Sequence, residues 1–210
     1  MDVPQGRFRL ERPDAGPRSP LRAWDAADEM ALRHIDEVGG GDGSVVIVGD
    51  AWGALTVALA DRGPTSVVDS YVTARAIADN LGANGRSADG IRVRSPLEVP
   101  DEPVDVLVVK IPRERAVLED DLRRLSPLLH TGTTVVAAGM TRDVHTSTLD
   151  LLGRLVGPTV TTKAVRKARL ALAEVADDRD TGPSRWPRTV HQDPPGLDVT
   201  AHAGVFGGRR

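Results

Sequence analysis

The sequence of 210 residues contains no cysteine, which excludes disulfide bonds, thiolate metal sites and a cysteine nucleophile. It has no apolar stretch long enough to span a bilayer, so we expect no membrane partner. Lysine is scarce as well and occurs only at positions 110, 163 and 167. The net charge of −3 gives no overall attraction for nucleic acid, so such a contact must rest on local basic patches. A cytoplasmic location fits the absence of cysteine.

Hydrophobic residues make up 40% of the chain, enough for the core of one α/β domain with short extensions. Short β-branched runs alternate along the chain with segments of helical period. We predict strands over 44–48, 65–69, 91–94, 104–111 and 133–138, and helices over 21–38, 54–60, 71–81, 113–129 and 147–155. This alternation predicts a doubly wound, Rossmann-like α/β fold with a parallel sheet.

Two further β-rich runs, 159–165 and 169–175, are separated only by a short basic turn and predict an antiparallel hairpin. A mostly parallel sheet that ends in an antiparallel C-terminal hairpin resembles the plan of the class I methyltransferases. We therefore expect a methyltransferase-like α/β domain over 21–176. Residues 1–20 are interpreted as a mobile or loosely docked N-terminal arm. The tail over 177–210 is polar and Pro-rich in its first part, and 197–201 could form one more strand.

The turn from Gly49 to Gly53 joins the first strand of this domain to its first core helix, where a nucleotide cofactor would lie. Methyltransferases place an acidic residue late in that strand and alternating glycines after it. Three residues depart from that pattern: Ile47, Ala51 and Trp52. Asp50 adds a charge of the wrong sign for a phosphate. The turn indicates a cofactor loop that has lost its working residues, and the alternative is that its glycines only serve a tight turn.

Two other positions belong to the same edge of the sheet. Asp69 follows the second strand, where a carboxylate often holds ribose hydroxyls, although we favour a role for Asp69 or Ser70 as a helix cap. Lys110-Ile111-Pro112-Arg113 follows the fourth strand, where methyltransferases that act on base amino groups carry an Asn/Asp-Pro-Pro-aromatic motif. Lysine only donates and cannot accept from an amine. We predict no catalytic residue, no bound cofactor, and a vestigial pocket of Gly49, Asp50, Gly53, Asp69 and Lys110.

Two groups of cations could contact nucleic-acid phosphates. The first lies on or beside the predicted hairpin and comprises Lys163, Arg166, Lys167 and Arg169. The second lies on the helix over 113–129, where interleaved acidic residues favour a solvated face instead; its cations are Arg113, Arg115, Arg123 and Arg124. The five histidines are scattered without metal-ligand spacing, so we predict no metal site.

Several short segments stand in order along the chain: Leu21-Arg22-Ala23-Trp24-Asp25, Gly49-Asp50-Ala51-Trp52-Gly53, Asp69-Ser70-Tyr71, Val109-Lys110-Ile111-Pro112, Arg142-Asp143-Val144-His145 and Lys167-Ala168-Arg169-Leu170. As an ordered set they resemble the bacterial two-domain ribosomal RNA guanine-N2 methyltransferases, most of all the large-subunit branch. That resemblance implies a duplicated methyltransferase fold. Its N-terminal copy is degenerate, and its C-terminal copy binds S-adenosylmethionine and methylates.

This chain resembles the N-terminal copy, which implies a non-catalytic domain that positions ribosomal RNA or supports the catalytic domain of the same polypeptide. Residues 177–210 would then be a linker and the truncated start of the catalytic domain, which His202-Ala203-Gly204-Val205-Phe206 resembles. S-adenosylmethionine would be the cofactor of the full-length protein only. Two alternatives stay open: a free-standing S-adenosylmethionine-dependent methyltransferase with a divergent cofactor loop, and a purely structural partner domain.

Overall fold

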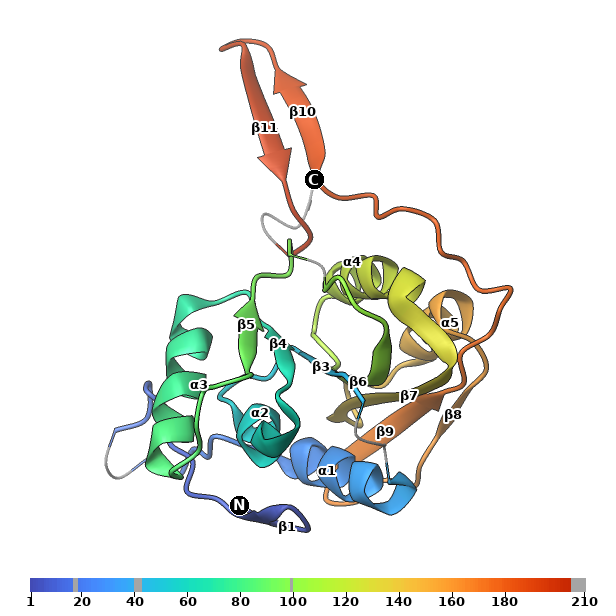
Figure 1. Cartoon of the computed structure of the whole chain (residues 1–210). Coiled ribbons are helices and arrows are strands. Elements are labelled where there is room, and N and C mark those ends of the chain that lie inside the picture. Colours follow the sequence, from blue (N-terminus) through green and yellow to red (C-terminus); the bar gives the residue numbers. More distant parts are fainter. Residues whose placement is uncertain (17–18, 40–42, 99, 205–210) are drawn as a thin grey trace.

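The computed structural model describes residues 1–16, 19–39, 43–98 and 100–204, so the expectation for Val205-Phe206 lies outside the described residues. Its main sheet contains β3 (Val45–Val48), β4 (Thr65–Val67), β5 (Arg92–Arg94), β6 (Val104–Lys110), β7 (Leu129–Met140), β8 (Thr159–Thr161) and β9 (Ala168–Ala173). The strand order is β5-β4-β3-β6-β7-β9-β8 (Figure 1). The pairs from β5 to β7 are parallel, whereas β9 is antiparallel to both β7 and β8. The predicted fold class is confirmed.

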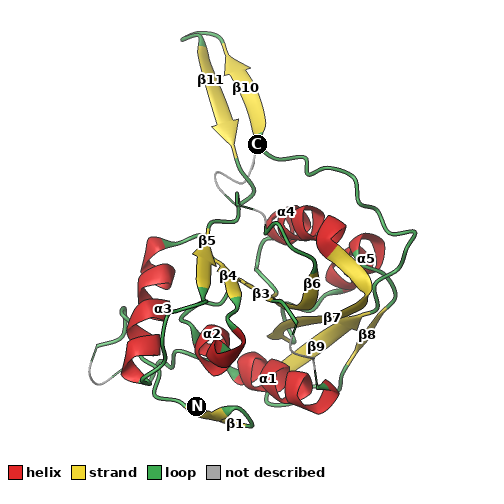
Figure 2. Cartoon of the chain, viewed as in Figure 1, coloured by secondary structure: helices red, strands yellow, loops and turns green. Residues whose placement is uncertain are grey.

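Helices cover both faces of this sheet (Figure 2). α1 (Ala26–Val38), α2 (Ala54–Ala58) and α3 (Tyr71–Ala83) pack on one face, and α4 (Arg115–Leu125) and α5 (Thr146–Leu155) pack on the other. Single 3₁₀ turns, η1 (Ala60–Arg62) and η2 (Ser126–Leu128), follow α2 and α4. Each central strand supplies side chains to both cores, because successive residues point to opposite faces. In β3, for example, Val45 and Ile47 join the first core and Val46 and Val48 the second.

Helix α1 begins later than its hydrophobic period predicts. The helix was expected from Leu21, but that side chain is 55% exposed and the first helical residue is Ala26. Asp25 accepts hydrogen bonds from the amides of Ala27 and Asp28, and the Asp28 side chain accepts one from the Asp25 amide. This reciprocal capping box satisfies amides that have no partner within the helix and so sets the start of α1.

The N-terminal segment is packed on the body, in contrast to the loosely docked arm expected from its composition. It forms a small hairpin of β1 (Asp2–Val3) and β2 (Gly6–Arg7). Its apolar side chains are buried in the core under α1, α2 and α3; they are Met1, Val3, Phe8 and Leu10. Two asparagines, Asn80 of α3 and its C-cap residue Asn84, hold the chain that follows. Asn84 Oδ1 accepts from the Arg9 amide at 2.8 Å, and Asn80 Oδ1 accepts from the Glu11 amide at 2.8 Å. A small number of apolar side chains and two side-chain amides are therefore enough to dock this segment, although its composition is mostly polar.

The chain after β9 is fastened to α4, η2 and α5. The Arg179 guanidinium donates to the carbonyls of Ser126 and Leu129 at 3.0 and 2.7 Å. Asp180 accepts from Arg123 at 2.9 Å and from Arg154 at 3.0 Å, and the hydrogen bond from Arg123 lowers the pKa of Asp180 to about 2. Farther along, Ser184 donates to Asp120 on α4. We call residues 179–184 the clasp.

Beyond the clasp, β10 (Arg188–Gln192) and β11 (Leu197–Ala201) form an antiparallel hairpin that projects away from the body (Figure 1). The strand over 197–201 was predicted and its partner β10 was missed, because β10 lies in a polar, Pro-rich stretch that indicates a linker.

Candidate functional site

The carboxyl ends of β3 and β6 meet at the turn where a cofactor is expected in such a sheet. Gly49 and Gly53 both have left-handed backbones, with φ of 74° and 87°. A Cβ on Gly53 would lie 3.0 Å from Ile77 Cα, so a side chain there would push α2 away from α3. Both glycines are therefore explained by a tight turn and close helix packing, without a ligand.

The Asp50 side chain turns inward from this loop and is only 1% exposed. Its carboxylate accepts from the amides of Gly53 and Thr56, at 3.1 and 2.8 Å, and from the Thr56 hydroxyl at 2.7 Å. These amides belong to the N-terminus of α2, and such groups bind anionic ligands in nucleotide sites. Here the protein supplies the anion itself. Burial raises the pKa of Asp50 despite these hydrogen bonds.

Lys110, the last residue of β6, reaches across the same edge to the capping box of α1. Its Nζ lies 2.9 Å from Asp25 Oδ1 and 2.6 Å from Asp28 Oδ1, and the side chain is 14% exposed. Burial alone would lower the pKa of Lys110, but the two carboxylates outweigh it and hold that pKa above its ordinary value. Burial raises the pKa of Asp28 to about 6, although Lys110 opposes the shift. We call Asp25, Asp28, Asp50 and Lys110 the Lys110 cluster.

Trp52 is half-buried against the core and does not stand free over the loop. Its carbonyl accepts from Asn80 Nδ2 at 2.8 Å, and the Arg12 guanidinium lies 4.7 Å from the centre of its ring. The ring therefore packs between the N-terminal segment and the sheet. The sequence predicts a large ring facing a ligand at this position, whereas the contacts found for Trp52 are with the N-terminal segment and α3.

Asp69 lies apart from the Lys110 cluster, in an open pocket of about 450 Å³ at the carboxyl ends of β4, β5 and β6. Ser70 is the N-cap residue of α3 and makes no side-chain capping hydrogen bond, and Asp69 has no hydrogen-bond partner among the described residues, so the favoured cap interpretation is wrong. Asp121 of α4 lines the same pocket, is 8% exposed and also has no hydrogen-bond partner within the described ranges. Burial raises the pKa of Asp121 to about 7, with a further contribution from the neighbouring charge of Asp120. We call this region the Asp69 pocket.

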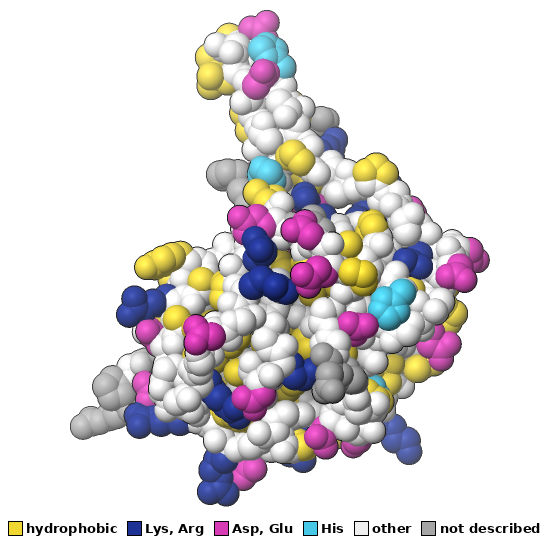
Figure 3. Space-filling model, in the orientation of Figure 1, with side chains coloured by type: hydrophobic (Ala, Val, Ile, Leu, Met, Phe, Trp, Pro, Cys, Tyr) yellow, Lys and Arg dark blue, Asp and Glu magenta, His cyan; other side chains and the backbone are white. Residues whose placement is uncertain are grey.

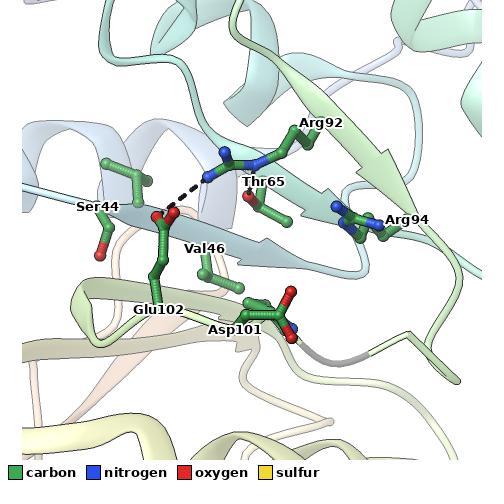
Figure 4. A pocket seen from close by; sticks show the side chains of 9 residues that line it. Ser44, Val46, Thr65, Arg92, Arg94, Asp101 and Glu102 are labelled. Carbon is green, nitrogen blue, oxygen red and sulfur yellow. Dashed lines mark hydrogen bonds and ion pairs between the residues drawn. The ribbon is translucent and has the colours of Figure 1, made fainter.

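A smaller pocket of about 100 Å³ lies at the opposite, amino-terminal ends of β3, β4 and β5. Figure 4 shows Arg92 between Thr65 and Glu102, with which it forms a hydrogen bond of 3.1 Å and an ion pair of 3.5 Å. Ligands of open α/β sheets bind beyond the carboxyl ends of the strands. The position of this pocket therefore gives no support for a cofactor site.

The basic turn between β8 and β9 has an unusual backbone. Arg166 and Lys167 have φ of 49° and 64°, and the turn is closed by pairing of Val165 with Ala168. Two-residue hairpin turns of this kind normally use Asn-Gly, because side chains disfavour positive φ. The four candidate cations do not behave alike: Arg166 pairs with Glu29, Arg169 Nε is buried without a hydrogen-bond partner, and Lys163 and Lys167 are exposed without an ion pair in the described parts of the chain.

The cations of α4 are mostly engaged. Arg123 is 7% exposed and binds Asp180 and Glu119, and Arg124 pairs with Asp120 at 3.1 Å. The solvated face expected from the interleaved charges is therefore wrong for Asp120, Asp121 and Arg123, all of which are buried. Arg113 and Arg115 remain exposed. Figure 3 shows acidic side chains interspersed with the basic ones on this face of the molecule.

Three residues that complete the Lys110 cluster and its hydrogen bonds were not predicted from the sequence: Asp25, Asp28 and Thr56. The signal available for the first two was the spacing Asp25-x-x-Asp28 just before a helical period, which is typical of a capping box. No helix in the described parts of the chain is both long and apolar enough to cross a bilayer. The same residues contain no group of three or more His, Asp or Glu side chains arranged to hold a metal ion.

Comparison with known proteins gives a consistent set of matches. Residues 1–177 match the family model described as RLMG N-terminal domain. Ribosomal RNA large subunit methyltransferase G of Streptomyces griseus is 42% identical, and the match covers 96% of this chain and 55% of that protein. The protein of the same name from Streptomyces avermitilis is 44% identical, with 98% and 56% covered. The chain thus spans about half the length of these curated relatives.

Solved structures show the same fold at low identity. The T. thermophilus 16S rRNA N2 methyltransferase (RsmC), solved with AdoMet and guanosine, is 19% identical with a TM-score of 0.66, over 100% of this chain and 53% of that one. A ribosomal protein L11 methylase from Lactobacillus delbrueckii is 19% identical with a TM-score of 0.58, over 71% of this chain and 79% of that one. At these identities the likeness concerns the fold alone.

Proposed function

The chain belongs to the RLMG N-terminal domain family, and on that premise we propose that it is the non-catalytic N-terminal half of an S-adenosylmethionine-dependent ribosomal RNA guanine-N2 methyltransferase. The names of the curated relatives and their greater length support this proposal. In it, a second domain of the same polypeptide binds S-adenosylmethionine and transfers the methyl group. Ribosomal RNA as partner and the cytoplasm as location belong to the same proposal.

The observation that carries the proposal is the Lys110 cluster. Asp50 takes up the α2 amides that would hold a ligand, and Lys110 ends β6 with an ammonium group bound to two carboxylates. An ammonium group in that position cannot accept a hydrogen bond from a base amine. Both ends of the expected site are thus occupied by internal contacts, which favours a domain without its own cofactor over a free-standing enzyme with a divergent loop.

Titration calorimetry with S-adenosylmethionine tests this directly on the 210-residue chain. We expect no binding with a Kd below about 1 mM, a free energy of about −4 kcal/mol. The full-length protein, measured in parallel, is the positive control and should bind. A Kd in the micromolar range for the 210-residue chain would overturn the non-catalytic assignment and favour the free-standing enzyme.

An RNA-positioning role is supported by the turn between β8 and β9. Lys163 and Lys167 are exposed without ion-pair partners among the described residues, and cations of this kind contact phosphates without reading sequence. The strained backbone of Arg166 and Lys167 places the Lys167 side chain at the tip of the hairpin, and Lys163 lies just before it. This turn is a better candidate than α4, where Arg123 and Arg124 are already paired.

Charge reversal separates the RNA role from a purely structural one. In the full-length protein, Lys167→Glu should weaken binding of ribosomal RNA fragments about 3- to 10-fold and reduce the slope of log affinity against log salt by about 1 to 2. Arg75→Glu is the matched control, since Arg75 is an exposed cation on α3, and should change affinity less than twofold. Equal effects of the two variants would remove the RNA role from this turn and favour the structural domain.

A further inference from the structure

The hairpin of β10 and β11 has two chemically different faces. Its register pairs Val190 with Val199 and Thr189 with Thr200, and side chains of a strand alternate between faces. One face therefore carries Val190, Leu197, Val199 and Ala201, with Arg188 and Gln192 at its two ends. The other face carries polar pairs, with a hydrogen bond of 2.9 Å between Thr189 and Thr200 and one of 2.8 Å between His191 and Asp198.

The apolar side chains of this face stay largely uncovered by the residues that the structure describes. Val190, Leu197 and Val199 are 53%, 57% and 43% exposed, and both strands project beyond the body (Figures 1 and 3). A single two-stranded hairpin is at best marginally stable in water without packing against other structure. Several exposed apolar side chains on one face of such a hairpin are typical of an interaction site.

We infer that this apolar face is the docking surface for the second domain of the same polypeptide, an inference that rests on the proposed function. The family match ends at residue 177, so the hairpin lies outside the domain that the family defines. The curated relatives extend well beyond the region that this chain covers, since only 55% and 56% of their length is matched.

A second copy of this chain is a weaker occupant. Stable dimers bury about 1,200–2,000 Å² in total. Four small or medium apolar side chains on a narrow ribbon are too few to provide that area without help from the body. A covalently linked domain needs much less contact area, because its tether already keeps the two surfaces close together.

Two neighbouring substitutions distinguish docking from hairpin folding. Val199→Asp places a charge on the apolar face, and Thr200→Asp places the same charge one residue later on the polar face. Hydrogen exchange of the hairpin amides should be measured for both variants and the wild type, in the full-length protein and in the 210-residue chain. In the short chain neither position has a docking partner, so the two variants should exchange within about twofold of each other.

In the full-length wild type we expect hairpin amides to exchange at least about tenfold more slowly than in the 210-residue chain, because docking stabilises them. Val199→Asp should abolish most of this protection, and Thr200→Asp should retain it. Equal exchange rates in the two wild-type lengths, or equal effects of the two variants in the full-length protein, would overturn the inference. A dimer of the 210-residue chain that Val199→Asp dissociates would assign the surface to a second copy and would also overturn it.

Failure of the docking surface can be distinguished from failure of the proposed function. Calorimetry with S-adenosylmethionine reports on the edge of β3 and β6, which the hairpin does not touch. A hairpin that stays unprotected in a full-length protein whose N-terminal half binds no cofactor would refute only the docking surface.

Discussion

The carboxyl edge of the main sheet has two halves that differ in how their charges are satisfied. At β3 and β6, the Lys110 cluster places one cation against Asp25 and Asp28 and fills the α2 N-terminus with Asp50. At β4 and β5, the Asp69 pocket is open, and neither Asp69 nor Asp121 has a hydrogen-bond partner among the residues described. The first half is closed by internal contacts, and the second is an unfilled, acidic cavity.

This difference shows two ways in which the polar groups at one edge of a sheet can be arranged. Backbone amides at a helix N-terminus and groups at the end of a strand need polar partners when they are buried. In the Lys110 cluster the protein supplies those partners itself. In the Asp69 pocket the carboxyl groups remain without them, and the burial of Asp121 carries a free-energy cost. The two halves should therefore respond to mutation with opposite signs.

The largest effect is expected when the only cation of the Lys110 cluster is removed. Lys110→Met leaves Asp25 and Asp28 without a counterion and should destabilise the fold by about 3–5 kcal/mol. Urea unfolding at pH 7.5 measures this loss. Lys167→Met, at an exposed lysine, is the control and should change stability by less than about 0.5 kcal/mol. Losses of the same size in both variants would show that the Lys110 cluster stabilises the fold no more than an exposed lysine does.

In the Asp69 pocket, neutralising a carboxyl group should stabilise the protein. The pKa of Asp121 rises from 3.8 to about 7 on folding, so its contribution to stability is present at acid pH and is lost as pH rises through about 7. Asp121→Asn should therefore raise the free energy of unfolding by about 2–4 kcal/mol at pH 8 and by almost nothing at pH 4.

The measurement is urea unfolding of both proteins across this pH range. Asp150→Asn, on the exposed side of α5, is the control and should show no such pH-dependent gain. A loss of stability in Asp121→Asn at pH 8 would mean that this carboxylate has a stabilising partner and that the two halves do not differ as described.

A smaller effect is expected at the loop itself. Asp50→Ala leaves the amides of Gly53 and Thr56 without their acceptor and should cost about 1–2 kcal/mol. Thermal unfolding measures this cost, and Asp36→Ala on the exposed face of α1 serves as control. S-adenosylmethionine should still fail to bind the variant, because Lys110 continues to occupy the end of β6. Recovery of binding would mean that Asp50 alone closes the site.

The smallest effect is expected in the turn between β8 and β9. This turn lies outside both the Lys110 cluster and the Asp69 pocket, so it serves as a reference for the effects of mutation there. Lys167→Gly removes a side chain from a residue at φ of 64° and should stabilise the fold by about 0.5 kcal/mol. Lys163→Gly, outside the turn, should give no gain. A rise in Tm for the first variant and none for the second is the expected result, and the reverse order would show that the turn is not strained.

Most of the fold could be predicted from the sequence because its strands are buried on both faces and therefore read as continuous β-branched runs. The failures have local causes. Strand β10 was missed because its alternating pattern lies in a Pro-rich stretch. The start of α1 was predicted too early because the hydrophobic period also includes residues before the capping box. The arm was judged by composition, although four apolar side chains are enough to bury it.

The candidate site could be predicted only in part. A cofactor loop without its working residues is predicted from residue types at fixed positions of a known turn, and it stays a prediction. The contact between Lys110 and Asp25 could not be predicted, since these residues are 85 positions apart and meet only in the folded chain. Whether Asp69 caps a helix was likewise decided by backbone geometry that sequence does not specify.

The clasp has a consequence for how the two halves of such a protein would move. Ser184 is held by Asp120, and β10 begins at Arg188, so only residues 185–187 separate a fixed point from the hairpin. That length can span no more than about 14 Å. A domain attached through it would search a small volume, at an effective concentration high enough for a weak contact to remain formed. A proteolytic cut between these two points would leave the hairpin joined to the second domain, and only contacts of that unit with the body would become bimolecular and dependent on protein concentration.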